Sequence, residues 1–462
     1  MKKSGEVHKT IKYYSTNLKS PEVSFREALL KGLAPDGGLY MPSEIPVADR
    51  SEIDSFRHMD YHEIAYSILR HWVGDEIEES CLKEICKNAY DFEIPIEDAG
   101  KKCHILRLDQ GPTASFKDFA ARMMGRMMQF FLADENKKVT ILTATSGDTG
   151  SAVASAFHGL DNIDVLILYP RDEITTLQRK QMTTLRGNVK AFAVGGKFDD
   201  CQHLVRRAFT DPLLSHIPLS SANSINIGRL LPQSVYYFYA WSRLSGISGE
   251  PVVFSVPSGN FGNLTGGLIA REMGMPSDLF IISTNANDEV PVYLKTGMYR
   301  KISPSLHCIS SAMNVGHPGN LPRIIALYGG DMDQNGKVSR EPDMERMRSE
   351  LFAVSISDEE TRNTIRRCYQ QSGIVLEPHG AVAWAGVQEY IRISHPEKSE
   401  NNRYVILETA HPAKFTEEIE NLTGTVPSLP PRLKKIFDEK EEIIMLDNKY
   451  DIFRDFILKN YN

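Results

Sequence analysis

The sequence predicts an α/β protein with two parallel-sheet domains and a mostly helical N-terminal domain. Three observations support this. Beyond about residue 101, short apolar segments of strand length alternate with helical segments, which is typical of βαβ units. Polar or glycine-rich loops follow several of these strands, as they do where parallel sheets bind ligands. The length of 462 residues exceeds what one ordinary core supports, so two or three domains are expected.

Composition and charge exclude several classes of protein. Lys and Arg number 53 against 60 Asp and Glu, giving a net charge of −7, and no long basic run occurs. Nucleic acid and anionic membranes are therefore poor partners. The six cysteines are scattered, which favours reduced thiols and a cytoplasmic location. Residues 1–20 lack the apolar core of a signal peptide, and no apolar run reaches membrane-spanning length.

Residues 1–100 are expected to form the N-terminal domain. The pattern predicts a short strand at 13–16 and helices at 24–33, 61–73 and 75–89. None of these segments carries obvious chemistry. A substrate-side lid and plain structural packing therefore remain alternative interpretations.

The remainder of the chain is expected to build the parallel sheets. Helices are predicted at 151–157 and 199–209. Strands are predicted at 139–144, 165–169, 189–194, 251–256, 279–283 and 404–407. Ligands should bind beyond the carboxyl ends of these strands.

Lys117 is the first candidate for chemistry. It follows a Pro/Thr/Ser turn and precedes an apolar, Met-rich run, so a helix should begin here, with Ser115 as N-cap and Asp118 at N3. The positive end of a helix dipole and the neighbouring rings of Phe116 and Phe119 both favour an uncharged amine. A Schiff-base lysine needs such an amine, because a free lysine with a pKa of about 10.4 is a poor nucleophile near neutrality. The alternative is a lysine that merely extends from an amphipathic helix to solvent.

Two loops are candidate anion sites. Residues 258–267 place four glycines and two asparagines between a strand and a helix, where backbone N–H groups can approach a phosphate. This loop is neither a P-loop nor a dinucleotide fingerprint. Residues 145–150 have the same setting with hydroxyl groups added, and suit a carboxylate. Ordinary tight turns are the alternative for both loops.

Further polar stretches are less specific. Residues 408–415 end a strand with a hydroxyl, an imidazole and an amine, and 223–229 combine two amides with an arginine suited to phosphate. Residues 377–381 could pack beside a ring or end a helix. Residues 331–336 imitate half of an EF-hand loop, but Pro342 stands where calcium needs a glutamate, so we interpret them as a turn and expect no metal site.

In this order, the segments 112–119, 145–150, 221–229, 258–265 and 409–415 resemble the threonine synthase family, in the branch with an N-terminal domain. The resemblance covers nearly the whole chain, including residues 37–42. It implies a pyridoxal-phosphate (PLP) enzyme of fold type II, with the cofactor between a large and a small α/β domain. On this basis we assign 131–240 to the small domain, and 101–130 with 241–462 to the large one.

The resemblance also implies roles for individual residues. Lys117 would bind the cofactor as a Schiff base, and Thr409 would meet the pyridine nitrogen, which implies an unprotonated or weakly polarised ring. Asp148 is assigned to the cofactor as well, although it stands where many proteins of this fold have asparagine. The cofactor phosphate would lie in the loop formed by Gly259, Asn260, Phe261, Gly262, Asn263 and Leu264. The substrate would be held by Thr145, Ser146, Gly147, Thr149, Asn226 and Arg229.

The implied reaction converts O-phospho-L-homoserine and water to L-threonine and phosphate. Lys117 would act as the base at adjacent carbons of the substrate. Two alternatives stay open. A phospho-lyase or dehydratase of the same fold would release 2-oxobutanoate, and a non-catalytic protein that binds phosphorylated metabolites would need only the glycine loops. The working expectation for the oligomeric state is a monomer.

Overall fold

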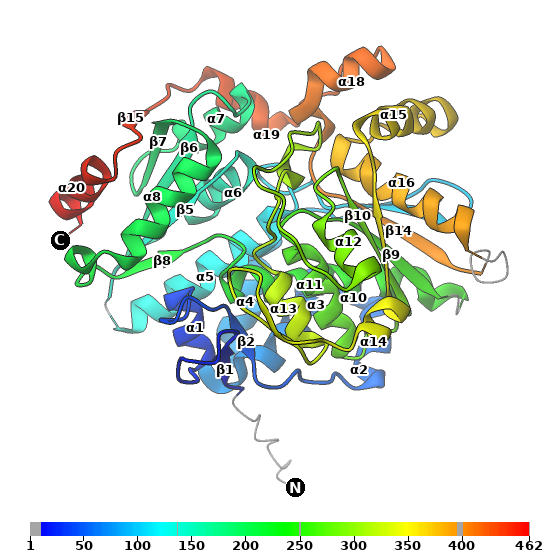
Figure 1. Ribbon diagram of the computed structural model, residues 1–462, viewed down its shortest axis with the longest axis horizontal. Helices are drawn as coiled ribbons and strands as arrows, with labels where there is room; N and C mark the ends of the chain where they lie inside the picture. Colours follow the sequence, from blue (N-terminus) through cyan, green and yellow to red (C-terminus); the bar gives the residue numbers. More distant parts are fainter. Residues whose placement is uncertain (1–10, 136, 249–250, 395–400, 462) are drawn as a thin grey trace, which may run out of the picture.

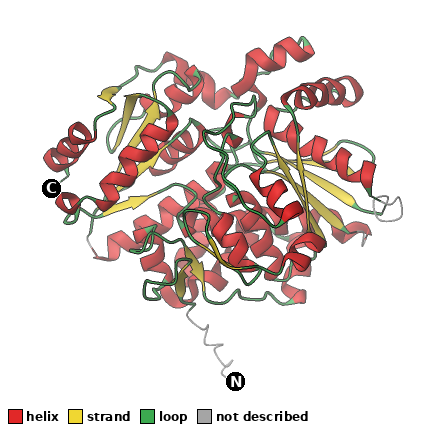
Figure 2. Ribbon diagram, viewed as in Figure 1, coloured by secondary structure: helices red, strands yellow, loops and turns green. Residues whose placement is uncertain are grey.

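The computed structural model describes residues 11–135, 137–248, 251–394 and 401–461. Residues 1–10 of the predicted N-terminal domain lie outside this part of the chain. Two sheets with helices on their faces form two lobes, and a largely helical N-terminal region lies below them in the view of Figure 1. Figure 2 shows helices against both faces of each sheet, as expected for buried parallel strands.

The small lobe is built on a five-stranded sheet with strand order β15-β7-β6-β5-β8, in which every pairing is parallel. Its strands are β5 (Val139–Ala144), β6 (Ile163–Pro170), β7 (Val189–Gly195), β8 (Leu219–Ser221) and β15 (Ile444–Asp447). The last strand corrects the domain assignment made from the sequence. Residues 444–447 pair with β7, and α20 (Tyr450–Asn460) packs against α8 (Phe198–Thr210), so the carboxyl terminus belongs to the small lobe.

The large lobe is built on a six-stranded sheet with strand order β13-β10-β9-β14-β4-β3, parallel except for the β3–β4 pair at one edge. Its strands are β3 (Ile96–Asp98), β4 (Cys103–Arg107), β9 (Val252–Pro257), β10 (Leu279–Thr284), β13 (Leu351–Ser355) and β14 (Arg403–Glu408). The strands predicted at 251–256, 279–283 and 404–407 lie here within one residue of their predicted limits. Their side chains are almost all buried, which is why their apolar runs were recognisable.

Helices surround both sheets. Besides α8 and α20, the longer ones are α5 (Lys117–Glu135), α6 (Asp148–Phe157), α7 (Thr176–Thr183), α10 (Val235–Ser248), α11 (Gly262–Glu272), α12 (Glu289–Thr296), α15 (Asp358–Ser372), α16 (Pro378–Ile393) and α18 (Thr416–Thr423). Shorter ones are α9 (Ile227–Leu230), α13 (Leu321–Leu327), α14 (Met344–Glu350), α19 (Pro431–Lys434) and the 3-10 turn η6 (Pro412–Phe415). Residues 377–381 begin α16 rather than end a helix, because the Glu377 carboxylate accepts hydrogen bonds from the backbone N–H groups of His379 and Gly380.

The N-terminal region packs beneath the two lobes. It contains a β1–β2 pair (Tyr13–Ser15 and Tyr40–Pro42) and helices α1 (Phe25–Lys31), α2 (Arg50–Ser55), α3 (Tyr61–Val73) and α4 (Glu79–Ala89). The α3 helix has the limits predicted from its spacing. Contacts of α1 with α5 and α9, and of α3 with α10, tie this region to the rest of the chain. No helix among the described residues is long and apolar enough to cross a membrane.

The turn predicted within 331–336 is formed by residues 333–337. It connects the paired strands β11 (Asp331–Met332) and β12 (Val338–Arg340), so the first two residues of the predicted turn belong to a strand. The Asp333 carboxylate accepts hydrogen bonds from the backbone N–H groups of Asn335 and Lys337, which fixes the turn from within.

We expect the buried carboxyl of Glu289 to make the free energy of unfolding depend on pH. Burial raises the pKa of this carboxyl to about 7, and its Oε2 atom has no hydrogen-bond partner among the described residues. The folded state therefore keeps its proton between pH 4.5 and 7 while the unfolded state loses it, so this contribution to stability is present below pH 4.5 and lost as pH rises through 7. We expect Glu289→Gln to be more stable than wild type at pH 8 by about 2–3 kcal/mol, and similar at pH 4.5. Urea unfolding at the two pH values checks this, and an equal difference at both would contradict it.

Candidate active site

Lys117 is the first residue of α5, at the end of a loop that is tied to the large sheet. The Phe116 N–H donates to the carbonyl of Thr409, and Ser115 makes an isolated β-bridge with Ala410. Ser115 Oγ accepts from the Lys117 N–H at 3.3 Å, as an N-cap would. Asp118 differs from its predicted capping role, because its carboxylate accepts from the N–H and hydroxyl of Thr113. The loop thus fixes Lys117 directly beside the end of β14.

The Lys117 amine lies in a cavity and is favoured in its uncharged form. Its side chain is 16% exposed, and Nζ lies 4.7 Å from the centre of the Phe116 ring. Burial lowers the pKa of the Lys117 amine; the carboxylate of Asp148 opposes this effect, and the cations of Lys414 and Arg229 add to it. The apolar ring expected from the sequence is therefore present, together with the charge of Lys414, which the sequence did not place there.

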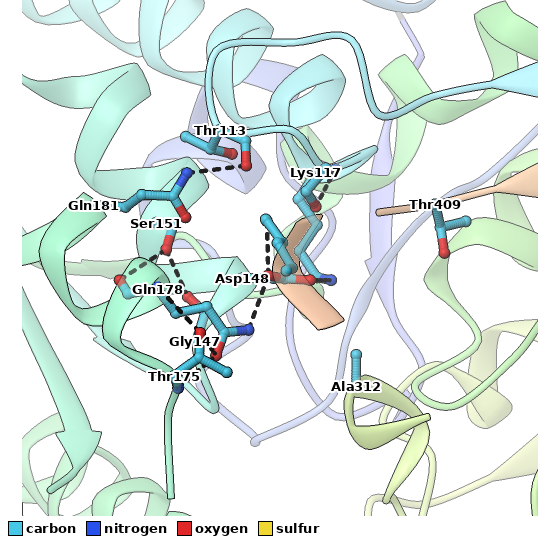
Figure 3. A network of polar contacts seen from close by, with 12 residues as sticks. Thr113, Lys117, Gly147, Asp148, Ser151, Thr175, Gln178, Gln181, Ala312 and Thr409 are labelled. Carbon is cyan, nitrogen blue, oxygen red and sulfur yellow. Dashed lines mark hydrogen bonds and ion pairs between the residues drawn. The ribbon is translucent and has the colours of Figure 1, made fainter. Parts of the chain in front are cut away.

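Asp148 is a shared partner of groups from both lobes. Its carboxylate lies 3.7 Å from Lys117 Nζ and 2.8 Å from Lys414 Nζ, and accepts a hydrogen bond from Gln178 Nε2 at 3.1 Å. Figure 3 shows Lys117 and Gln178 approaching this carboxylate from different sides. Burial alone would raise the pKa of Asp148, but the ammonium of Lys414 and the hydrogen bond from Gln178 help to lower it well below its usual range. Asp148 is therefore a buried carboxylate that Lys414 helps to hold in its ionised form.

The glycine loop joins β9 to the N-terminus of α11. Phe261 adopts a left-handed conformation (φ 61°), and a Cβ on Gly259 would lie 2.6 Å from the Cα of Met313, so the loop is closely packed. Tyr236 and Tyr237 donate hydrogen bonds to Asn263 Oδ1. Asn263 Nδ2 is buried and has no partner among the described residues, so a donor remains for a ligand.

One cavity of about 470 Å³ brings most predicted residues together. Its lining includes Lys117, Thr145, Ser146, Asp148, Thr149, Arg229, Gly259, Asn260, Phe261, Gly262, Asn263 and Thr409. Gly147 and Leu264 do not line the cavity themselves, but neighbouring residues in the loop after β5 and in the first turn of α11 do. Asn226 lies outside it.

The loop after β5 is shaped by its own hydroxyl. Thr145 Oγ1 accepts hydrogen bonds from the N–H groups of Gly147 and Gly150, which curls the chain into the start of α6. Gly147 has φ 130°, and a Cβ there would overlap Gln178. Ser146 and Thr149 line the cavity and supply the hydroxyl groups of this loop.

Asn226 and Arg229 occupy different settings. Asn226 caps α9: its Oδ1 accepts from the Gly228 N–H, and its Nδ2 donates to the carbonyls of Leu29 and Ser221. Arg229 lines the cavity, donates to the carbonyl of Ala222, and has an Nε without a partner among the described residues. Burial lowers the pKa of Arg229 to about 10. Arg229 can therefore bind an anion, whereas both side-chain polar atoms of Asn226 are already hydrogen-bonded within the protein.

Residues to which no definite role could be assigned from the sequence complete the walls of the cavity. His379 Nδ1 is hydrogen-bonded to Glu377, and its Nε2 accepts from the Ala312 N–H, which ties residues 311–313 to α16. Thr409 Oγ1 lies 3.5 Å from Glu377 Oε1. The Glu-Pro-His-Gly sequence, with an acidic N-cap before proline at N1, was the available signal. Other cavity residues without a recognisable motif include Gln178, Arg206, Lys301 and Asn314.

The donor set fits pyridoxal phosphate. The cavity offers a buried amine of lowered pKa for the aldehyde, and backbone N–H groups at the start of α11 with the spare amide of Asn263 for the phosphate. The Thr409 hydroxyl lines the same space. This combination of a basic lysine and an anion loop between two α/β lobes characterises enzymes that use this cofactor.

Comparison with known families agrees with this class. The family model described as pyridoxal-phosphate dependent enzyme matches residues 95–409, so the chain is a PLP-dependent enzyme. The models described as threonine synthase N terminus and threonine synthase, C-terminal match residues 12–90 and 381–457. The chain belongs to the threonine synthase family.

Individual relatives span the whole chain. Threonine synthase from Haemophilus influenzae is 40% identical over 96% of this chain and 99% of its own length, and that from Escherichia coli is 39% identical over 93% and 95%. The crystal structure of PLP-bound threonine synthase from Brucella melitensis superposes with a TM-score of 0.90 at 34% identity, covering 98% of this chain and all of that one. These likenesses confirm the fold class, the enzyme class and the cofactor predicted from the sequence.

Proposed function

We propose that this enzyme converts O-phospho-L-homoserine and water to L-threonine and inorganic phosphate. The observation that carries the proposal is the buried Lys117 amine of lowered pKa, in a cavity that also contains two loops suited to anions. The relatives named threonine synthase, similar over the full length, support the choice of substrate. The substrate carries a carboxylate and a phosphate, so it presents two anions to the same cavity as the cofactor.

Bound pyridoxal phosphate would supply the electron sink that makes the Cα–H and Cβ–H bonds of the substrate acidic. Lys117, the loop from Gly259 to Leu264, Thr409 and Asp148 would hold it. Lys117 would attach to it covalently, because its amine is the nucleophile in the cavity with a lowered pKa. Thr409 would contact its ring nitrogen.

Lys117 also moves protons. An amine whose pKa is lowered by burial can accept a proton at the substrate's Cα and return one after water has added at Cβ. Several proton transfers at adjacent carbons suit one flexible lysine side chain whose backbone is fixed at the start of α5. The Phe116 ring and the burial of the site keep this nitrogen away from bulk water.

Separate groups would hold the two anions of the substrate. The hydroxyls of Ser146 and Thr149 and the backbone around Thr145 and Gly147 would bind the carboxylate at the start of α6. Arg229 would bind the phosphate through its unpartnered Nε. We assign Asn226 the task of positioning Arg229 through α9, in place of the expected substrate contact, because its amide is fully hydrogen-bonded.

The same proposal covers the cellular compartment and the oligomeric state of the enzyme. We infer a cytoplasmic protein that acts as a monomer on a small phosphorylated amino acid. The six cysteines, which are all free thiols, support a reducing compartment. The lobes and the cavity come from one chain, which is consistent with a complete site in a monomer.

Product analysis tests the proposal. Purified enzyme loaded with pyridoxal phosphate and given O-phospho-L-homoserine should release threonine and phosphate in equal amounts. Release of 2-oxobutanoate in place of threonine would identify a phospho-lyase and overturn the assignment. Binding of the substrate without any product would instead favour a binding protein.

A further inference from the structure

Lys414 is a charged group for which the proposed reaction has no use. Its side chain is completely buried, and its Nζ lies 2.8 Å from Asp148 Oδ1. Among the described residues, Asp148 is the carboxylate that lies within ion-pair distance of it. A buried lysine is costly unless an anion compensates its charge. Packing alone therefore does not explain why the buried Lys414–Asp148 ion pair is present.

The pair joins the two lobes at the cavity. Asp148 begins α6 and follows β5 of the small sheet, whereas Lys414 lies in η6 and follows β14 of the large sheet. The backbone of η6 is fixed by His411, whose carbonyl accepts from the Lys414 N–H and whose Nδ1 accepts from the Ala413 N–H. Lys414 is thus held from one lobe and points its ammonium at a carboxylate of the other.

A carboxylate at this position creates an electrostatic problem. Asp148 lies 3.7 Å from the nitrogen that would bind the cofactor, so an anionic cofactor on Lys117 has to lie beside it. Like charges at such distances repel strongly in a buried site. Asparagine would avoid this repulsion, but this chain has aspartate. A fixed cation next to the carboxylate, as Lys414 is to Asp148, removes most of this repulsion.

We propose that Lys414 is a positioning residue that neutralises Asp148, so that the carboxylate can orient Lys117 without repelling the anionic cofactor. The inference rests on the proposed function only in taking Lys117 as the cofactor lysine. Together, Asp148 and Lys414 take the place of one neutral amide. Removing either member leaves a net charge beside the Lys117 nitrogen, and removing both does not.

Other titratable groups among the described residues lie around this pair. Arg229 on α9 and Glu377 at the start of α16 act on the Lys117 nitrogen, while Asp118 and His411 lie near Lys414. Asp118 is hydrogen-bonded to Thr113, and Glu377 to the start of its own helix. The Lys414 ammonium lowers the pKa of Asp118 and of His411, so Lys414→Met also removes this effect, whereas Asp148→Asn leaves both groups unchanged.

The test follows the absorbance of the lysine-bound cofactor as a function of pH, without substrate. Its titration midpoint reports the charge at the Lys117 nitrogen. Lys414→Met should raise the midpoint by at least about one pH unit, because an uncompensated carboxylate favours the protonated nitrogen. Asp148→Asn should lower it, because an uncompensated ammonium disfavours that proton. The double variant Asp148→Asn/Lys414→Met should titrate close to wild type.

If Asp148 and Lys414 act as a charge pair, the two single variants shift the titration midpoint in opposite directions, and the shifts cancel in the double variant. A purely structural contact would shift the midpoint of both single variants in the same direction. The inference is wrong if both midpoints shift in one direction or neither moves. If Lys414→Met does not fold, Asp148→Asn and the double variant still decide, since the second substitution must reverse the shift of the first. Lys83→Met removes an ion-paired lysine on the surface of α4 and should leave the midpoint unchanged. Failure of wild type to form the absorbance band would count against the cofactor role of Lys117 instead.

Discussion

Lys117→Ala is expected to abolish threonine formation, with a rate at least about 10³-fold below wild type. The substitution removes both the covalent attachment point of the cofactor and the base that moves protons, while the small side chain is compatible with the start of α5. The absorbance band of the lysine-bound cofactor should disappear at the same time. Stopped assays of threonine, with spectra recorded on the same samples, check both effects.

A matched control separates this result from a general effect of losing a lysine. Lys83→Ala removes an exposed, ion-paired lysine on α4 that does not line the cavity, and should retain full activity and the full absorbance band. If Lys117→Ala kept more than about a tenth of the wild-type rate, the assignment of Lys117 as the catalytic amine would be untenable.

Arg323→Met is expected to lower the free energy of unfolding by about 3 kcal/mol or more. Arg323 is fully buried on α13 and donates to the carbonyls of Tyr40, Ser224 and Ile225 and to Asn320 Oδ1. It thereby connects the N-terminal region to the loop that leads into α9. Methionine has a similar length but no donor, so the buried carbonyl of Tyr40 and the part-buried carbonyls of Ser224 and Ile225 would lose their partner.

Urea unfolding measures the loss of stability, and threonine formation measures its effect on the site. Ser224 and Ile225 line the cavity, so activity should fall even in the fraction that stays folded. Arg300→Met, at an exposed position, is the control and should change stability by less than about 0.5 kcal/mol. A loss below about 1 kcal/mol for Arg323→Met would show that water or neighbouring groups replace its hydrogen bonds.

The sequence was informative where the signal is local. The strands at 139–144 and 279–283 are short apolar runs because both of their faces are buried, and Lys117 stands out because turn, lysine and helix are contiguous. The glycine loop was recognisable because its glycines and asparagines are contiguous. In the structure, Gly259 lies against Met313 and has no room for a side chain.

The features that were missed depend on residues far apart in the chain. Lys414 and Asp148 are 266 positions apart, so no spacing rule connects them. Strand β15 contains an exposed methionine and a terminal aspartate, and becomes a strand through pairing with β7, about 250 residues earlier. Asn226 contributes one of the two amide groups of its motif, but whether this amide faces a ligand or a neighbouring carbonyl is decided by the packing of α1, which no local pattern reveals.

The return of β15 to the small sheet also changes which backbone the sheet leaves open at that side. Without that strand, the backbone of the seven-residue β7 would form an open sheet edge, and such edges recruit strands from other molecules. With β15 in place, the edge strand has four residues, and a short edge is a poorer template for pairing with another chain.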